Sequence, residues 1–221
     1  MDWSPLHISL TAASCATLFS LVLGTLAAWV SIRMKGQLRA VFDGICTLPM
    51  VLPPTVLGFF LLVIFGSRRP LGRLLSQIGL AVVFNRRATV VAATVVAFPL
   101  VYRTVRAAFE QIDFSVVHAA RTLGLDEWRI FVHILVPGAV PGIGAGAVLG
   151  FTRALGEFGA TLMLAGDIPG HTETIPVAIW AAAEAGRMDR AVLWVTVIVL
   201  VSFISILLMN FFTSRTLRHG A

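Results

Sequence analysis

Long apolar runs, separated by short polar or basic connections, set the hydropathy pattern of this chain. A helix needs roughly 20 apolar residues to cross a hydrocarbon core about 30 Å thick. Stretches that meet this requirement lie at residues 8–32, 42–65, 88–108, 138–164 and 191–212. Helices satisfy their own backbone polar groups inside lipid, so the pattern predicts an all-α integral membrane protein with about five transmembrane helices. Residues 1–221 are expected to form a single transmembrane domain.

A polar island lies between the third and fourth runs, at about residues 113–137. Its sequence from residue 117, VHAARTLGLDEWRIFVHILVP, predicts a helix, a turn and a second helix. Ala119 and Ala120 are small enough for another surface to approach the backbone, and Gly124 suits the left-handed conformation that ends a helix. Asp126 and Glu127 suit the start of the next helix.

The second run contains helix-breaking residues in the stretch LPMVLPPTVLGFF. Pro49, Pro53 and Pro54 each remove a helical hydrogen bond, and Gly58 follows them. The helix is therefore expected to be kinked or broken, and broken helices at membrane depth line protein or water rather than lipid. Pro53 and Pro54 are candidate pathway or gate residues, with a packing kink as the alternative.

The fourth run has a glycine at every fourth position: Gly138, Gly142, Gly146 and Gly150. Such a row lies on one face of a helix and allows another backbone to come very close. We expect these glycines to pack helix against helix. A tightly packed helix directly after the polar island would transmit motion of that island as a rigid body.

Arg153 and Glu157 lie farther along the same run, four residues apart. Charged side chains inside a membrane helix are costly, so the pair is expected to face protein or water. Mutual neutralisation at this spacing is the favoured interpretation. The alternative is that Arg153, with Thr152 or Thr161, eases an oxyanion through a pore. The candidate pore residues on this run are therefore Thr152, Arg153, Glu157 and Thr161.

The composition agrees with a membrane location, since 57% of the residues are hydrophobic, 13% are charged and the mean hydropathy is +0.90. The net charge of +6 comes from basic residues scattered between the apolar runs, which is typical of connections beside membrane segments rather than of nucleic-acid binding. Cys15 and Cys46 lie in apolar runs without metal-ligand spacing, so neither a disulfide nor a metal site is expected. The chain has no G-x-x-x-x-G-K-S/T phosphate loop, so ATP hydrolysis by this polypeptide alone is excluded, and no residue cluster suggests an enzyme.

The polar island resembles the EAA loop of ABC importer permeases. The matching positions are His118, Ala119, Ala120, Gly124, Ile134 and Pro137. The first three stand where the family has Glu-Ala-Ala, so a histidine replaces the usual carboxylate here. The resemblance implies a short cytoplasmic coupling helix that sits in a groove of a separate ATPase subunit. An ordinary amphipathic connector is the alternative.

Four stretches extend the resemblance over nearly the whole chain: LPMVLPPTVLGFFLL, AARTLG, LGEFGAT and IPGHTETIPVAIW. Together they are similar to the permeases of molybdate importers (ModB). This resemblance implies a homodimer in membrane lipid, bound to two ABC ATPase subunits (ModC-like) and supplied by a periplasmic protein that binds molybdate or tungstate (ModA-like). It also implies that ATP is bound by the partner subunit and that this chain holds no cofactor. The alternatives are a sulfate or thiosulfate-type oxyanion permease and a membrane scaffold without a transport role.

An odd number of spans places the two termini on opposite sides of the membrane. Because an ATPase is met only in the cytoplasm, the resemblance implies a periplasmic N-terminus and a cytoplasmic C-terminus in a bacterial inner membrane. Charge bias favours this orientation only weakly, because Arg68, Arg69 and Arg73 then lie outside. Short amphipathic helices are expected on the outer side, at residues 71–78 and 175–185.

Overall fold

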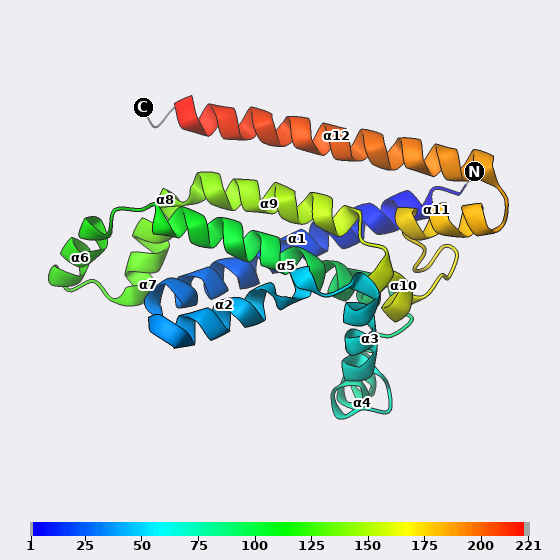
Figure 1. The fold of residues 1–221 in the computed structure, drawn as a ribbon, viewed down its shortest axis with the longest axis horizontal. Coiled ribbons are helices and arrows are strands. Elements are labelled where there is room, and N and C mark those ends of the chain that lie inside the picture. The colour runs from blue at the N-terminus through cyan, green and yellow to red at the C-terminus, as the bar shows by residue number, and fades with distance from the viewer. Residues whose placement is uncertain (1, 219–221) are drawn as a thin grey trace.

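The computed structural model describes the backbone of residues 2–218 and the side chains of residues 2–207. All regular elements in this part of the chain are helices (Figure 1). Among the described residues, three single helices are long and apolar enough to cross a membrane, namely α1 (Ser4–Arg33), α5 (Arg86–Glu110) and α12 (Met188–Arg218). Two bent helix pairs, each counted as one span, bring the number of crossing segments to five. The predicted all-α membrane fold is confirmed.

The core is formed by α1, α5 and α9 (Val140–Leu155), which run side by side along the long axis of the molecule (Figure 1). A Cβ added to Gly24 of α1 would lie 3.1 Å from the backbone nitrogen of Tyr102 in α5. Small buried side chains from all three helices meet nearby: Ala13, Ala16, Ala93, Ala97 and Ala154. Small residues allow this close approach, as expected where lipid provides no hydrophobic drive for helix association.

The first bent pair is α2 (Gly36–Val51) and α3 (Pro54–Phe65), which meet at an angle of 110°. The break that the prolines predict is present, although the helix begins at Gly36 rather than at residue 42. Pro54 starts α3, where its missing N–H costs little. α3 turns away from the core and carries α4 (Pro70–Gln77) at its far end, within one residue of the predicted 71–78 helix (Figure 1).

The prediction of one continuous span over residues 138–164 is wrong. A bend of 74° separates α9 from the helical turns before it, which are α7 (Glu127–Ile130), the π-helix η1 (Phe131–Leu135) and α8 (Val136–Gly138). α9 then ends at Leu155, and α10 (Gly159–Ala165) follows after a break. Apolarity alone does not show where the backbone leaves helical geometry, and here a glycine and a buried carboxylate stand at the second break.

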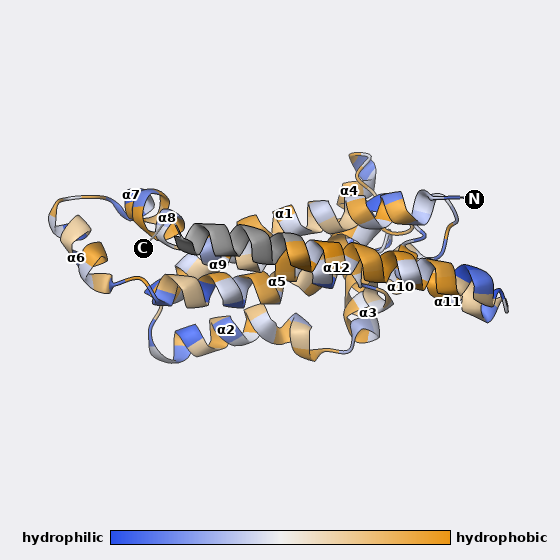
Figure 2. Cartoon of the chain, turned by 90° about the horizontal axis from the view of Figure 1, so that it is seen from above, coloured by the Kyte–Doolittle hydropathy of each residue, from blue (hydrophilic) through white to orange (hydrophobic). Residues whose placement is uncertain are grey.

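α6 (Phe114–Thr122) and α11 (Ile175–Glu184) are the remaining helices, and α11 matches the helix expected at 175–185. α12 packs along α11 and α9. Its outward side chains are apolar through most of its described length, for example at Val192, Val199 and Phe203 (Figure 2). Such a surface suits contact with lipid. The end of the predicted 191–212 span has side chains outside the described residues.

Candidate functional site

α6 stands at one end of the molecule, within the polar island (Figure 1). The helix begins after Asp113, whose Oδ1 accepts a hydrogen bond from the backbone N–H of Ser115 at 2.8 Å. This hydrogen bond lowers the pKa of the Asp113 carboxyl below its usual value. The ionised carboxylate therefore caps the N-terminus of α6.

The turn after α6 requires a backbone conformation that favours glycine. Gly124 has a φ of +82°, and its N–H donates to the carbonyl of Arg121 at 3.0 Å. The N–H of Leu125 donates to the carbonyl of Ala120 at 3.1 Å, which completes a Schellman motif. The left-handed conformation predicted for Gly124 is confirmed. Asp126 then caps α7 by accepting from the N–H of Arg129 at 2.8 Å.

Glu127 connects the polar island to the first core helix. One of its carboxylate oxygens lies 2.7 Å from Nη2 of Arg33, at the end of α1, and the other accepts from Nε of Arg121 in α6 at 2.7 Å. Arg33 also lies over the ring of Trp29, 4.4 Å from its centroid. Ion pairs thus join α1, α6 and α7. Sequence reasoning recognised Glu127 as a residue of the first helical turn but missed Arg33, because no local pattern brings the two together.

The outer surface of the island carries large apolar side chains among its polar ones. These exposed apolar residues are Phe114, Val116, Leu123, Trp128 and Val132. Leu123 is 81% exposed. His118 and Ala119 also face outward, whereas Ala120 is buried in the core cluster. Exposed apolar patches of this kind mark interaction sites.

The other two residues on family positions lie closer to the core. Ile134 is half-buried in η1 and packs against the core cluster, and Pro137 is exposed in α8. α8 ends at Gly138, and the membrane helix that follows starts at Val140.

Gly142, Gly146 and Gly150 pack along successive turns of α5, and Gly138 faces Ile112, just beyond the end of that helix. A Cβ added to Gly138 would lie 3.1 Å from Ile112, and one added to Gly142 would lie 2.3 Å from Ala108. The corresponding distances are 3.5 Å from Gly146 to Val105 and 2.8 Å from Gly150 to Val101. The approach is tightest at Gly142 and ordinary van der Waals contact at Gly146. Gly138 belongs to α8, before the bend, and the other three belong to α9.

Arg153 and Glu157 form an ion pair at the end of α9, with Nη1 and Oε2 at 2.8 Å. The expectation that both residues lie on one helix is wrong, because α9 ends at Leu155. The other carboxylate oxygen of Glu157 accepts the backbone N–H of Ala160 at 2.8 Å and so caps α10. The Glu157 side chain is 2% exposed and that of Arg153 is 35% exposed.

A hollow of about 290 Å³ joins this ion pair to the break between α2 and α3. Pro54, Leu100 and Arg153 are among the residues that line it. A Cβ added to Gly159 would lie 2.9 Å from Cβ of Pro54, so the two breaks contact each other directly. The structure therefore brings together two of the predicted gate residues from distant parts of the sequence.

The remaining predicted gate residues are arranged differently. Pro53 is exposed at the bend itself. The hydroxyl of Thr152 donates within α9, to the carbonyl of Val148 at 2.9 Å. Thr161 is buried in α10. None of these three residues is among those that line the 290 Å³ hollow.

Asp43 of α2 is at the centre of a polar network that sequence reasoning missed. Its carboxylate accepts from the hydroxyl of Ser31 in α1 at 2.8 Å and also binds Tyr102 and Arg106 of α5. Arg39 connects Asp43 to Glu110, at the end of α5. The sequence signal that could have identified this network was Asp43 itself, an acidic residue at the start of an apolar run. No group of His, Cys, Asp and Glu among the described residues is arranged to hold a metal ion.

Residues 20–218 match the family of binding-protein-dependent transport system inner membrane components. The chain belongs to this family. Its helical fold with several membrane-crossing segments is that of a multi-pass inner membrane protein. The family assignment covers almost all of the described chain.

Two relatives carry the same name and differ in coverage. The molybdenum transport system permease protein ModB of Escherichia coli (strain K12) is 44% identical over 83% of this chain and 80% of its own length. ModB of Haemophilus influenzae is 39% identical over 97% of this chain and 95% of its own length. A probable sulfate transport system permease protein of Chlorokybus atmophyticus is more distant, at 33% identity over 94% of this chain and 72% of its own length.

Solved structures agree on the fold. A chain from the crystal structure of a bacterial ABC transporter involved in import of the acidic polysaccharide alginate has a TM-score of 0.76. The match covers 96% of this chain and 78% of that chain at 19% sequence identity. The architecture of this family member is therefore that of an ABC importer permease.

Proposed function

We propose that this chain is the permease subunit of an ABC importer that moves molybdate, and also tungstate, across the bacterial inner membrane. The observation that carries the proposal is the 39% identity to a molybdenum permease over 97% of the chain. A sulfate or thiosulfate-type permease is the second candidate, and the sulfate permease match at 33% identity is its support. The lower identity makes it the weaker one.

The partners follow from the surface of the polar island. α6 and the residue directly after it expose Phe114, Val116 and Leu123 at one end of the molecule, which is a poor arrangement for a protein without a partner there. A groove on an ABC ATPase subunit (ModC-like) would cover these side chains. The working complex would contain two copies of this chain, two ATPase subunits that bind ATP, and a periplasmic molybdate-binding protein (ModA-like).

This assembly fixes the orientation. The ATPase subunits lie in the cytoplasm, so α6 must lie on the cytoplasmic side, and five crossings then place the N-terminus in the periplasm. α11 and the loop before it lie at the end of the molecule opposite α6 (Figure 1), where the binding protein would dock. The expected localisation is the inner membrane, with a cytoplasmic C-terminus.

Transport would proceed by switching between two arrangements of the dimer. ATP binding draws the ATPase subunits together and moves the two α6 helices with them. Glu127, held by Arg33 and Arg121, passes this motion to α1, while the glycine row passes it from α9 to α5. The chain breaks at Pro53, between α2 and α3, and at Gly156, between α9 and α10. Motion of the core helices at these two breaks would open or close a pathway.

Reconstitution tests the substrate. The permease, its ATPase subunit and its binding protein are placed in liposomes, and the binding protein is loaded separately with molybdate, tungstate or sulfate. We expect molybdate and tungstate to stimulate ATP hydrolysis and to accumulate, with sulfate near background. Uptake of sulfate without uptake of molybdate would establish the second candidate instead, and the absence of any associating ATPase would point to a scaffold.

Replacing Gly124 by leucine tests the coupling loop. A leucine at a φ of +82° is strained by about 1–2 kcal/mol, so the turn and the exposed face of α6 should rearrange. We expect normal membrane insertion, weakened ATPase binding and uptake close to background. Gly124→Asn is the matched control, because asparagine tolerates the left-handed conformation. Normal uptake by the leucine variant would show that this turn does not couple the two subunits.

A further inference from the structure

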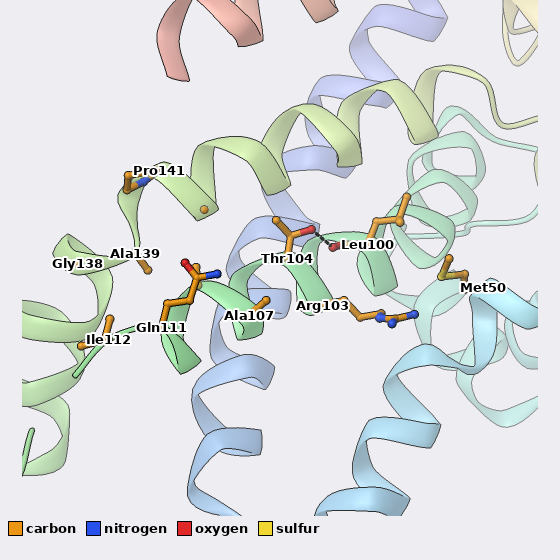
Figure 3. A pocket seen from close by; sticks show the side chains of 12 residues that line it. Met50, Leu100, Arg103, Thr104, Ala107, Gln111, Ile112, Gly138, Ala139 and Pro141 are labelled. Atoms are coloured by element: carbon orange, nitrogen blue, oxygen red, sulfur yellow. Dashed lines mark hydrogen bonds between the residues drawn. The ribbon is translucent and has the colours of Figure 1, made fainter. Parts of the chain in front are cut away.

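A hollow of about 800 Å³ lies on the side of α5, between the end of α2 and the α8–α9 bend (Figure 3). Its wall consists mostly of small or apolar residues, among them Ala107, Ala108 and Gly142. Arg103 is the charged residue in this wall, and Gln111 adds a side-chain amide. The sequence analysis did not select Arg103, because a basic residue near the end of a membrane helix is ordinary.

Arg103 has no counter-ion among the residues that the structure describes. Neither an ion pair nor a side-chain hydrogen bond joins it to any of them, and its side chain is exposed. Arg106, three residues later on the same helix, is instead bound to Asp43 and lies near Glu110. The two arginines are therefore in different states: Arg106 is neutralised within the fold, and the charge of Arg103 is available.

The unpaired charge of Arg103 lies within the membrane-crossing helix α5, away from its end. At 1.5 Å per residue, Arg103 lies about 10 Å from the end of the helix at Glu110. An arginine within a membrane segment faces protein or a water-filled space rather than lipid. Figure 3 shows its side chain extending along the hollow toward Met50. Filling of this hollow by water would account for both the exposure of Arg103 and its free charge.

The hollow continues into the one that Arg153 lines. Met50 and Leu100 belong to the walls of both. Each wall contains one arginine, and no carboxylate lines either of them in the described part of the chain. Arg153 is already held by Glu157. The two hollows together form a route from the breaks toward the α6 end of the core, with a net positive wall.

We propose that Arg103 is the transient binding residue for the tetrahedral oxyanion as it leaves toward the cytoplasm. This inference rests on the proposed function. A planar guanidinium matches two oxygens of a tetrahedral oxyanion, and the Gln111 amide supplies a further donor nearby. Because the hollow is wide and open, the contact is weak, and release remains fast. Arg153 has a structural role in this arrangement.

The first test compares Arg103→Gln and Arg103→Lys in the reconstituted importer with molybdate-loaded binding protein. We expect Arg103→Gln to fold normally and to retain stimulated ATP hydrolysis, while molybdate moved per ATP falls roughly tenfold. Arg103→Lys keeps the charge but not the planar pair of donors, so its transport should fall between that of Arg103→Gln and that of the wild type. Arg73→Gln, which removes an exposed arginine of α4, is the matched control and should behave like the wild type.

The second test restores the charge chemically. In a background with Cys15 and Cys46 replaced by alanine, Arg103→Cys is treated with a cationic or an anionic methanethiosulfonate reagent of similar size. The cationic reagent should restore molybdate uptake, the anionic reagent should not, and molybdate should slow both reactions. Equal defects in Arg103→Lys and Arg103→Gln, rescue by both reagents, or a joint loss of ATP hydrolysis and uptake would each overturn the proposal. If the wild-type importer moves no molybdate, the proposed function fails instead.

Discussion

Replacing Arg153 by alanine is expected to destabilise the folded permease by about 3–5 kcal/mol. The Glu157 carboxylate, which is 2% exposed, would keep its hydrogen bond from Ala160 but lose the guanidinium that neutralises it. For a chain of this size the loss corresponds to a fall in melting temperature of roughly 10 °C. Thermal unfolding of the purified protein in detergent measures it.

The double variant Arg153→Ala/Glu157→Gln separates the two roles considered for the pair. A neutral glutamine can still accept the Ala160 N–H, so we expect more than half of the lost stability to return. Transport per folded dimer should return with it. A double variant that is stable but transports slowly would mean that Arg153 supplies a positive field to the passing oxyanion. If the single and double variants are equally unstable, the unpaired charge of Glu157 is not the cause of the lost stability.

Replacing Gly142 by leucine is the second change with a large expected effect. A Cβ there would already lie 2.3 Å from Cβ of Ala108, so the leucine must push α9 away from α5. Overpacking of this kind costs about 1–3 kcal/mol or more, and we expect a lower melting temperature and little folded dimer. Fluorescence-detected size exclusion and thermal unfolding provide the measurements.

Gly144 offers a matched control on the same helix. Nothing lies within 4 Å of a Cβ added there, so Gly144→Leu should fold nearly as well as the wild type. Gly142→Ala should be rescued in part by Ala108→Gly, because the second change removes the atom that the first one meets. If Gly142→Leu and Gly144→Leu have the same melting temperature, the glycine row does not hold α9 against α5.

The turn of the polar island was predictable because its signals are local. A positive φ at Gly124 and a cap at Asp126 depend on residues within a few positions of each other, which the sequence displays. The glycine row was equally visible, since a period of four places glycines on one helix face. The sequence did not show which helix packs against the glycine row. Only the structure shows that the row meets Ala108 and Val101 of α5, and that Gly142 is tighter than Gly146.

The polar residues that pair between helices were harder to predict because their partners are far away in the sequence. Asp43 is bound by Ser31 and by two residues of α5, and Glu127 is bound by Arg33. A pattern of apolar runs contains no information about which charged residue pairs with which. For the same reason the sequence drew attention to Arg153, which is neutralised, rather than to Arg103, which is not.

Apolar runs, prolines and glycines thus determined the membrane location, the approximate positions of the spans, the first helix break and the turn of the polar island, because each depends on the local backbone and on burial in lipid. Tertiary structure decided where α9 ends, which helices touch, and which charges are paired. Those features depend on close approach between segments that are distant in the chain. The carboxylate of Glu157 illustrates the division: its cost in a membrane is evident from the sequence, but its role as a cap for α10 exists only in the folded protein.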